Sequence, residues 1–281
     1  MMKSIPGDPF TDNKALPPEI HLALRAHYGL EDSLSTQYLR YLTAISTFDF
    51  GPSYRYKDLT VNDIIQQGFP ISATLGLEAM VIALIAGISL GVIAALRRTH
   101  WIDHAAMVSA TIGVSVPSFI TAALLQYVIA LKLGLLPVAR WGTFAHTILP
   151  ALSLAAMPTA IIARLVRANM IEVLHQDYIK TAKAKGLPLF HIIMRHALCN
   201  ACAPILPFLG QLTANILIGS FVIEKIYGIP GLGQWFVNSV TTRDYTVVMG
   251  MTIFYSIILL SALFLSEKLH QFLDPRIKEK Q

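Results

Sequence analysis

The sequence predicts an all-α, polytopic helical membrane protein, and three observations support this prediction. Hydrophobic residues make up 54% of the chain and charged residues only 14%, whereas soluble globular proteins average about 25% charged residues. Apolar runs near the roughly 20 residues that cross a bilayer recur along the chain. Lys and Arg gather at alternate ends of these runs, as the positive-inside rule describes. The net charge of +5 is therefore interpreted as inward-facing loops rather than as nucleic-acid binding.

Residues 1–70 form a mixed segment, which we expect on the outside of the membrane. They hold six Lys or Arg against eight Asp or Glu, so they lack the positive excess of an inner loop. Local patterns predict helices over residues 20–28 and 33–46, and a turn at residues 49–53. The first ten residues contain no apolar core of the length that a signal peptide needs.

Five apolar runs predict five membrane spans. Arg97 and Arg98 directly follow the first run, and Arg164 and Arg167 end the third, so these ends are expected inside. Pro117 lies within the second run and predicts a kink, while small residues in the third predict a helix interior to a bundle. The predicted spans cover residues 71–96, about 105–133, 148–166, 203–223 and 247 to about 264 or 269.

This topology places residues 1–70 outside with no signal peptide and no span before them. We therefore expect that a longer reading frame encodes a first span ahead of this sequence. In the alternative, the span at residues 71–96 drives the translocation of the preceding segment by itself.

Between the third and fourth runs lies a basic segment, Asp177–Ala201, which predicts an exposed element on the inner face. Gly186 and Pro188 divide it, because glycine destabilises a helix and proline disfavours helix at the residue before it. The first helical piece is expected to begin near Met170 or Ile171. Its apolar residues lie among lysines, as in a docking site with an apolar centre and a charged rim. A basic loop resting on anionic lipid is an equal alternative. The charged residues of the segment are Asp177, Lys180, Lys183, Lys185 and Arg195.

No pattern in the chain predicts an enzyme. The glycine-rich residues 228–233 lack the Lys-Ser or Lys-Thr pair of a phosphate-binding loop and are interpreted as a tight turn. His191 and His196 have no metal-ligand spacing, and Cys199 and Cys202 are interpreted as small apolar residues. We therefore expect no catalytic residue, metal ligand or cofactor in this chain.

Charged residues near the predicted spans form no convincing relay for proton coupling. Only Glu78 is placed to face a pore. The energy for any transport is therefore expected from a partner that acts on the basic segment. The charges expected at span ends are Glu224, Lys225, Glu267 and Lys268.

Residues 178–188, followed by residues 195–198 and 200–201, resemble the coupling loop of ABC importer permeases, in the form found in the oligopeptide/dipeptide family. Ala182 and Gly186 match the small positions of that loop, where a bulky side chain would prevent close docking. Further motifs, in the same order and over nearly the whole chain, are similar to the family's B-type permease subunit. They are Pro6–Phe10, Asp49–Ser53, Tyr56–Asp58, Ile226–Gln234 and Arg243–Tyr245.

The resemblance implies the ABC importer permease fold, with six spans in the family. The family's first span precedes the motif at residues 6–10, which independently supports a missing first span and leaves five spans here. The implied partners are a homologous C-type permease, two ATPase subunits that hold ATP and Mg, and an external solute-binding protein that delivers peptide. The lipid bilayer is a further partner, and nucleic acid is not expected.

The resemblance also suggests how the chain divides. Residues 1–70 are expected to be external, residues 71–269 to form the transmembrane permease domain, and residues 270–281 to form a cytoplasmic tail. The cytoplasmic coupling loop is expected at residues 167–202. The ATPase-coupling interface is expected at Ile171, Leu174, Tyr178, Ala182, Ala184, Gly186 and Leu187.

The leading functional prediction is a permease subunit of an ATP-driven peptide importer in the bacterial inner membrane. A permease of the same family for dipeptides, glutathione or nickel is an alternative, since the family selects its substrate largely in the binding protein. A self-sufficient proton-coupled carrier and a non-transporting membrane scaffold are alternatives from other classes.

Overall fold

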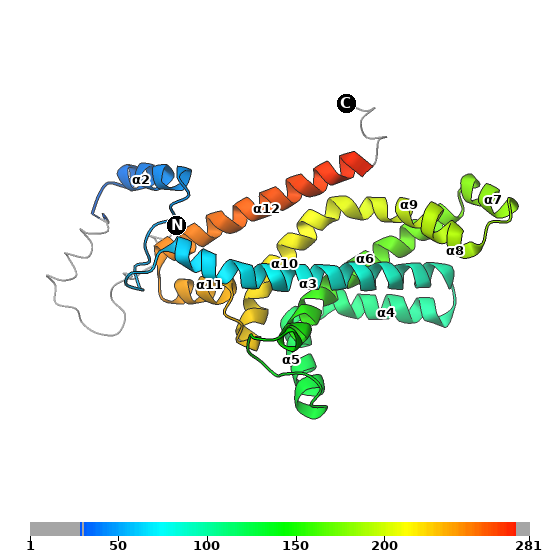
Figure 1. Ribbon diagram of the computed structural model, residues 1–281, viewed down its shortest axis with the longest axis horizontal. Helices are drawn as coiled ribbons and strands as arrows, with labels where there is room; N and C mark the ends of the chain where they lie inside the picture. The colour runs from blue at the N-terminus through cyan, green and yellow to red at the C-terminus, as the bar shows by residue number, and fades with distance from the viewer. Residues whose placement is uncertain (1–28, 30, 274–281) are drawn as a thin grey trace. The chain divides into compact units, whose positions relative to one another are not determined.

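The computed structural model describes residue 29 and residues 31–273, and in these residues all regular secondary structure is helical (Figure 1). The all-α prediction is therefore confirmed. The helix expected over residues 20–28, the motif at residues 6–10 and most of the tail at residues 270–281 lie outside the described residues.

The described helices follow one another with short connections. The turns η2 and η3 are π-helical and η4 is a 3₁₀ turn. In chain order the helices are α2 (Leu34–Ser46), α3 (Val61–Leu96), α4 (Trp101–Ser115), α5 (Ser118–Leu125), η2 (Gln126–Lys132), α6 (Phe144–Leu174), α7 (Asp177–Ala184), α8 (Leu189–His191), η3 (Ile192–Ala197), α9 (Leu198–Cys202), η4 (Ala203–Ile205), α10 (Leu206–Tyr227), α11 (Leu232–Thr241) and α12 (Tyr245–Leu273).

The chain forms two compact units. One comprises residues 1–71 and 230–257, and the other comprises residues 72–229 and 258–281. The long helices α3 and α12 each contribute residues to both.

In the first unit, Asp244 attaches a turn to the beginning of α12. Its buried carboxylate accepts hydrogen bonds from the Ser53 hydroxyl and from the backbone N–H groups of Tyr54 (3.2 Å) and Arg55 (3.3 Å). The N–H of Val247 also donates to it (3.4 Å), which satisfies one of the free donors in the first turn of the helix. One carboxylate therefore holds two segments that are about 190 residues apart in the sequence.

The starts of α2 and α3 in this unit are capped by side chains as well. Ser33 accepts a hydrogen bond from the N–H of Thr36 (3.3 Å) at the start of α2, so the helix predicted over residues 33–46 is confirmed. Before α3, the Thr60 N–H donates to the Asp63 carboxylate (2.9 Å), and the Asp63 N–H donates to the Thr60 hydroxyl (3.1 Å). This reciprocal cap starts α3 at Val61, well before the residue 71 expected from hydropathy alone.

Between residues 31 and 273, four helices are long and apolar enough to cross a membrane, namely α3, α6, the continuous run at residues 189–227, and α12. A fifth span results if α4 is counted together with α5 and η2, although this pair is bent by 108°. The expected kink at Pro117 is therefore a complete break. Pro117 has an extended ψ of 141° and is the N-cap residue of α5, and a proline at this position lacks the N–H needed to continue α4.

Glycines allow close packing of the helices in the second unit. A Cβ added at Gly87 would lie 2.8 Å from Ile162 Cβ, and one added at Gly91 would lie 2.6 Å from Val166 Cβ. The backbone of α3 therefore approaches α6 more closely than any larger residue permits. Buried residues recur along α6 from Thr147 to Met170, and 56% of its apolar window is buried, which agrees with its predicted interior position.

The structure corrects the expected environment of Glu224. This residue was expected at a span end, yet its side chain is fully buried and accepts a hydrogen bond from the Ser72 hydroxyl (2.7 Å). The partner lies in α3, far away in the sequence. A buried carboxylate with a hydroxyl donor is a packed structural element rather than an interfacial charge.

Candidate coupling site

The first helix of the basic segment begins later than the sequence suggested. The predicted helix start near Met170 or Ile171 is wrong, because these residues continue α6 as far as Leu174. Residues 172–174, which are Glu, Val and Leu, are compatible with a helix, so no local signal ends α6 before Leu174. His175 and Gln176 interrupt the helix, and Gln176 occupies the N-cap position of α7 with an extended backbone and no side-chain cap.

α7 ends in a left-handed turn at Gly186, with φ of +76°. The N–H of Gly186 donates to the Lys183 carbonyl (2.9 Å), and the N–H of Leu187 donates to the Ala182 carbonyl (3.3 Å). These two bonds define a Schellman motif. A Cβ at Gly186 would meet no atom within 4 Å, so glycine is required here for its backbone conformation rather than for space. The predicted break at Gly186 is confirmed.

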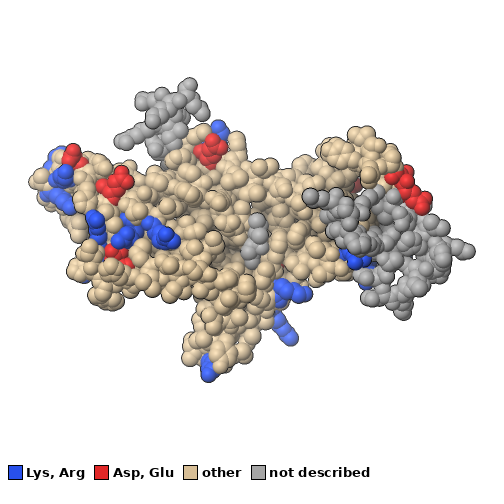
Figure 2. Space-filling model, turned by 180° about the vertical axis from the view of Figure 1, so that it is seen from behind, with Lys and Arg blue, Asp and Glu red and all other residues tan. Residues whose placement is uncertain are grey.

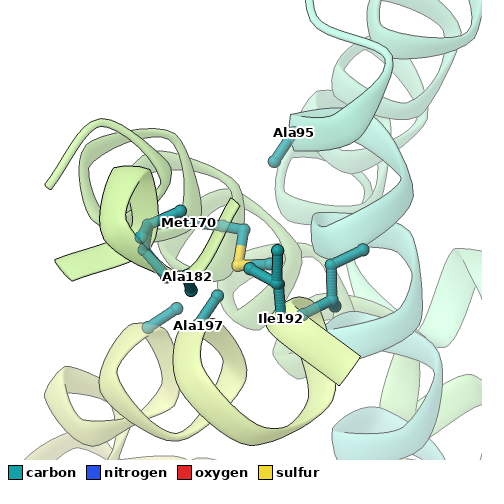
Figure 3. Close-up of a cluster of buried hydrophobic side chains, with 8 residues drawn as sticks. Ala95, Met170, Ala182, Ile192 and Ala197 are labelled. Carbon is teal, nitrogen blue, oxygen red and sulfur yellow. The ribbon is translucent and has the colours of Figure 1, made fainter. Parts of the chain in front are cut away.

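The inner face of α7 packs onto a small apolar core of the second unit. Figure 3 shows Met170, Ala182, Ile192 and Ala197 pointing toward one another. Leu187 packs against the same core, a contact that frequently accompanies the Schellman motif at the residue after its glycine. α7 is therefore packed onto the end of a helix bundle and is not a free loop. The core consists of Ala95, Met170, Ile179, Ala182, Ile192, Ile193, Ala197 and Ala201.

Two asparagine side chains add polar attachments around this core. The Asn200 amide donates to the Tyr178 hydroxyl (2.9 Å) and so connects α9 to α7. The Asn169 amide donates to the Ala201 carbonyl (3.3 Å) and connects α6 to α9. Tyr178, the exposed aromatic residue of α7, is therefore held by α9, which leads into α10.

An ion pair joins α4 to α6 near the same core. Arg167 Nε and Nη2 lie 2.5 Å and 2.7 Å from the two carboxylate oxygens of Asp103, which also accepts a hydrogen bond from the Thr99 N–H (3.1 Å). The side chain of Asp103 is only 3% exposed and that of Arg167 is 28% exposed. A bidentate, largely shielded pair of this kind is stronger and better oriented than a surface pair. Through Asp103 and Thr99, this ion pair attaches the turn between α3 and α4 to α6. The point of attachment, Arg167, lies three residues before Met170 of the core.

The predicted interface residues fall into two groups. Only the exposed group is available for direct contact with a partner. A larger side chain at Ala182 would first disturb the chain's own core. Tyr178, Ala184 and Gly186 are exposed, whereas Ile171, Leu174 and Leu187 are half-buried and Ala182 is buried.

The exposed surface around α7 is basic. Figure 2 shows Lys and Arg side chains gathered at the end that carries α7 and the α3–α4 turn. Lys180 Nζ lies 2.8 Å from the Asp177 carboxylate, and this hydrogen bond, with the charge of Lys180, lowers the pKa of Asp177 below its ordinary value. The exposed basic residues at this end are Arg97, Arg98, Lys180, Lys183, Lys185 and Arg195.

Three exposed apolar residues were not anticipated at this surface. Leu189, Phe190 and Met194 follow the Gly186 turn, and Phe190 is 75% exposed. Phe190 and Met194 are four residues apart and share one face of their helix. Their sequence region reads as the start of a membrane span, so apolar character alone could not show that they lie beside α7.

Residues 87–279 match the family described as binding-protein-dependent transport system inner membrane component. The dipeptide transport system permease protein DppB of Bacillus subtilis (strain 168) is 53% identical over 278 residues, which cover 99% of this chain and 90% of that protein. The oligopeptide transport system permease protein OppB of Salmonella typhimurium is 46% identical over 281 residues, with coverages of 99% and 92%.

Two solved ABC transporters have a similar fold. An inward-facing MetNI methionine ABC transporter matches with a TM-score of 0.63 and 16% identity, covering 75% of this chain and 96% of that chain. An amino acid ABC transporter solved with histidines matches with a TM-score of 0.57 and 18% identity, with coverages of 75% and 94%. At these identities the similarity shows the fold alone, which is the ABC importer permease fold predicted from the sequence.

These matches define the class of protein. The family consists of transport components rather than catalysts, and the chain is a multi-pass protein of the bacterial inner membrane. The absence of a cofactor and the residues of the coupling interface stay predictions. The match over residues 87–279, together with the high identity over almost the whole sequence, shows that this chain belongs to the family of binding-protein-dependent transport system inner membrane components.

Proposed function

We propose that the chain is the B-type permease subunit of an ATP-driven importer that carries peptides into the bacterial cell. The named roles of the two relatives, in dipeptide and oligopeptide transport, support a peptide substrate. In this proposal a homologous C-type permease completes the translocation path. An external solute-binding protein delivers the peptide, and two ATPase subunits bind ATP and Mg.

α7 is the proposed contact with an ATPase subunit, within a cytoplasmic coupling loop at residues 167–202. The observation that carries this proposal is the packing of Ile179 and Ala182 onto a core shared with α6. Because that core is closely packed, a displacement of α7 acts on α6 and not only on a loop. Closure of the ATPase subunits then switches the path between inward-facing and outward-facing states. Residues 1–70 are proposed to be external.

A charge substitution at an exposed position of α7 tests the docking contact. Ala184→Glu places a negative charge on α7 without entering the core, because Ala184 is exposed. We expect peptide uptake to fall at least tenfold and the ATPase subunits to be lost from the purified complex. The amount of permease in the membrane should stay unchanged.

The matched control is His100→Glu, which adds the same charge at the exposed start of α4, on the neighbouring turn. Under the docking proposal this variant keeps both uptake and the ATPase subunits. Equal losses in the two variants would instead support a basic end that merely rests on anionic lipid. Uptake by the permease reconstituted without ATPase subunits would contradict an ATP-driven mechanism altogether.

A further inference from the structure

One face of α10 is exposed although the helix belongs to a membrane span. Phe208, Gln211, Asn215 and Val222 are exposed at spacings of three, four and seven residues, which place them along one side. Other sides of α10 are packed. A Cβ at Gly210, for example, would lie 2.8 Å from the Leu263 backbone of α12. These exposed residues share one side of the helix, which we call the amide stripe of α10.

The two amides of this stripe lie deep in the span. Residues 203–223 were predicted to cross the membrane, and Gln211 and Asn215 each lie two residues from the centre of that stretch, or about 3 Å along the helix axis. Within the part of the chain that the structure describes, neither side chain makes a hydrogen bond. Exposing an unbonded amide to hydrocarbon is costly, because lipid offers no donor or acceptor.

Exposed faces of other helices are built differently. On α3 the exposed residues around the middle of the predicted span are Leu77, Val81 and Ile85, an aliphatic stripe that suits lipid. On α12, exposed Thr252 and Ser256 donate to backbone carbonyls of their own helix, at 2.7 Å and 2.8 Å. Those hydroxyls are satisfied without water. The amide stripe therefore differs in chemistry from the faces that lipid can cover.

We infer that Gln211 and Asn215 line the aqueous translocation path and bind the backbone of the passing peptide. This inference rests on the proposed function. Each carboxamide supplies two donors and one acceptor, which match the C=O and N–H groups of a peptide bond. Such contacts do not depend on the peptide's side chains. The absence of charge keeps binding weak enough for release.

The spacing of the two amides also fits an extended peptide. Residues four apart on a helix are separated by about 6 Å along its axis. In an extended chain, alternate residues repeat at about 6.7 Å. Gln211 and Asn215 can therefore contact two successive backbone groups on one side of the same peptide.

Cysteine labelling tests whether the stripe faces water. Gln211→Cys and Asn215→Cys are introduced after Cys199 and Cys202 are replaced by Ser, and the assembled transporter is labelled in membranes with a charged, water-soluble maleimide. Labelling is done with and without a non-hydrolysable ATP analogue. We expect at least tenfold faster labelling than at the matched control Val81→Cys, and slower labelling when a tripeptide is being transported.

Uptake measurements test the peptide contact. The variant carrying both Gln211→Leu and Asn215→Leu is expected to lose at least tenfold in uptake, equally for tripeptides of alanine, lysine or glutamate. Unlabelled cysteines and normal uptake by the Leu variant would overturn this inference but leave the proposed function standing, with the stripe covered by the second permease. If the unmodified transporter takes up no peptide, the proposed function fails, and the peptide contact fails with it.

Discussion

The turn at Gly186 allows a quantitative test of how α7 is held. Gly186→Ala adds a methyl group that meets no atom within 4 Å, so sterics between residues contribute nothing. The entire cost arises from φ of +76°, because a left-handed backbone is unfavourable for an L-residue by about 1–2 kcal/mol. That free energy corresponds to roughly a 5- to 30-fold increase in the population in which the end of α7 is open.

Limited proteolysis measures this opening directly. Lys183 lies in the last turn of α7 and Lys185 directly follows the helix, and both are exposed sites for trypsin. Cleavage there follows the open population when closing is fast. We expect Gly186→Ala to be cleaved roughly 5- to 30-fold faster. Gly186→Asn should be affected less, since asparagine tolerates the left-handed region.

The matched control is Gly142→Ala. Gly142 also has open space around its Cβ but lacks a positive φ, so no change in trypsin cleavage is expected. Equal cleavage rates for the unmodified protein, the alanine variant and the asparagine variant would refute the assignment of the Schellman turn as the element that ends α7.

Three further predictions concern packing around the coupling site. Ala182→Leu should lower the free energy of unfolding by about 1–3 kcal/mol through overpacking, whereas Ala184→Leu should leave the melting temperature of the purified permease unchanged. Asp103→Asn should lower the free energy of unfolding by about 2–4 kcal/mol, because Arg167 loses its charged partner in a shielded site. Thermal unfolding in detergent measures this change, and an unchanged unfolding midpoint would mean that the pair is not formed. Gly91→Ala should lower the melting temperature more than Gly142→Ala does, because its Cβ would lie 2.7 Å from a carbonyl oxygen of α6.

Much of the fold could be predicted because membrane spans have a strong compositional signal. The apolar runs located every candidate span, and proline marked the break before α5. The lengths of the helices were less predictable, since a helix does not end where the membrane ends. α6 continues past Arg167 to Leu174 because arginine, glutamate and leucine are all good helix formers. The bend of 108° depends on tertiary packing, which proline alone does not encode.

The coupling site could be predicted only in part, for a similar reason. Gly186 and Pro188 are local signals and correctly marked the end of α7. The pairing of Asp103 with Arg167, and of Glu224 with Ser72, joins residues far apart in the sequence. Single-sequence patterns do not report such contacts. The division between buried Ala182 and exposed Ala184 follows from helical periodicity, which turns positions two residues apart to opposite sides.

The uninterrupted inner half of α6 has a mechanical consequence. After Pro158, its residues 159–174 form a rod about 24 Å long, and the core beneath α7 is fixed to the end of that rod. Pro158 removes one backbone hydrogen bond at the other end and offers a natural pivot. A tilt of about 10° around this pivot displaces the end of the rod by roughly 4 Å. A stroke of a few ångströms delivered at α7 thus suffices to reorient half of a membrane-spanning helix without unwinding any of it.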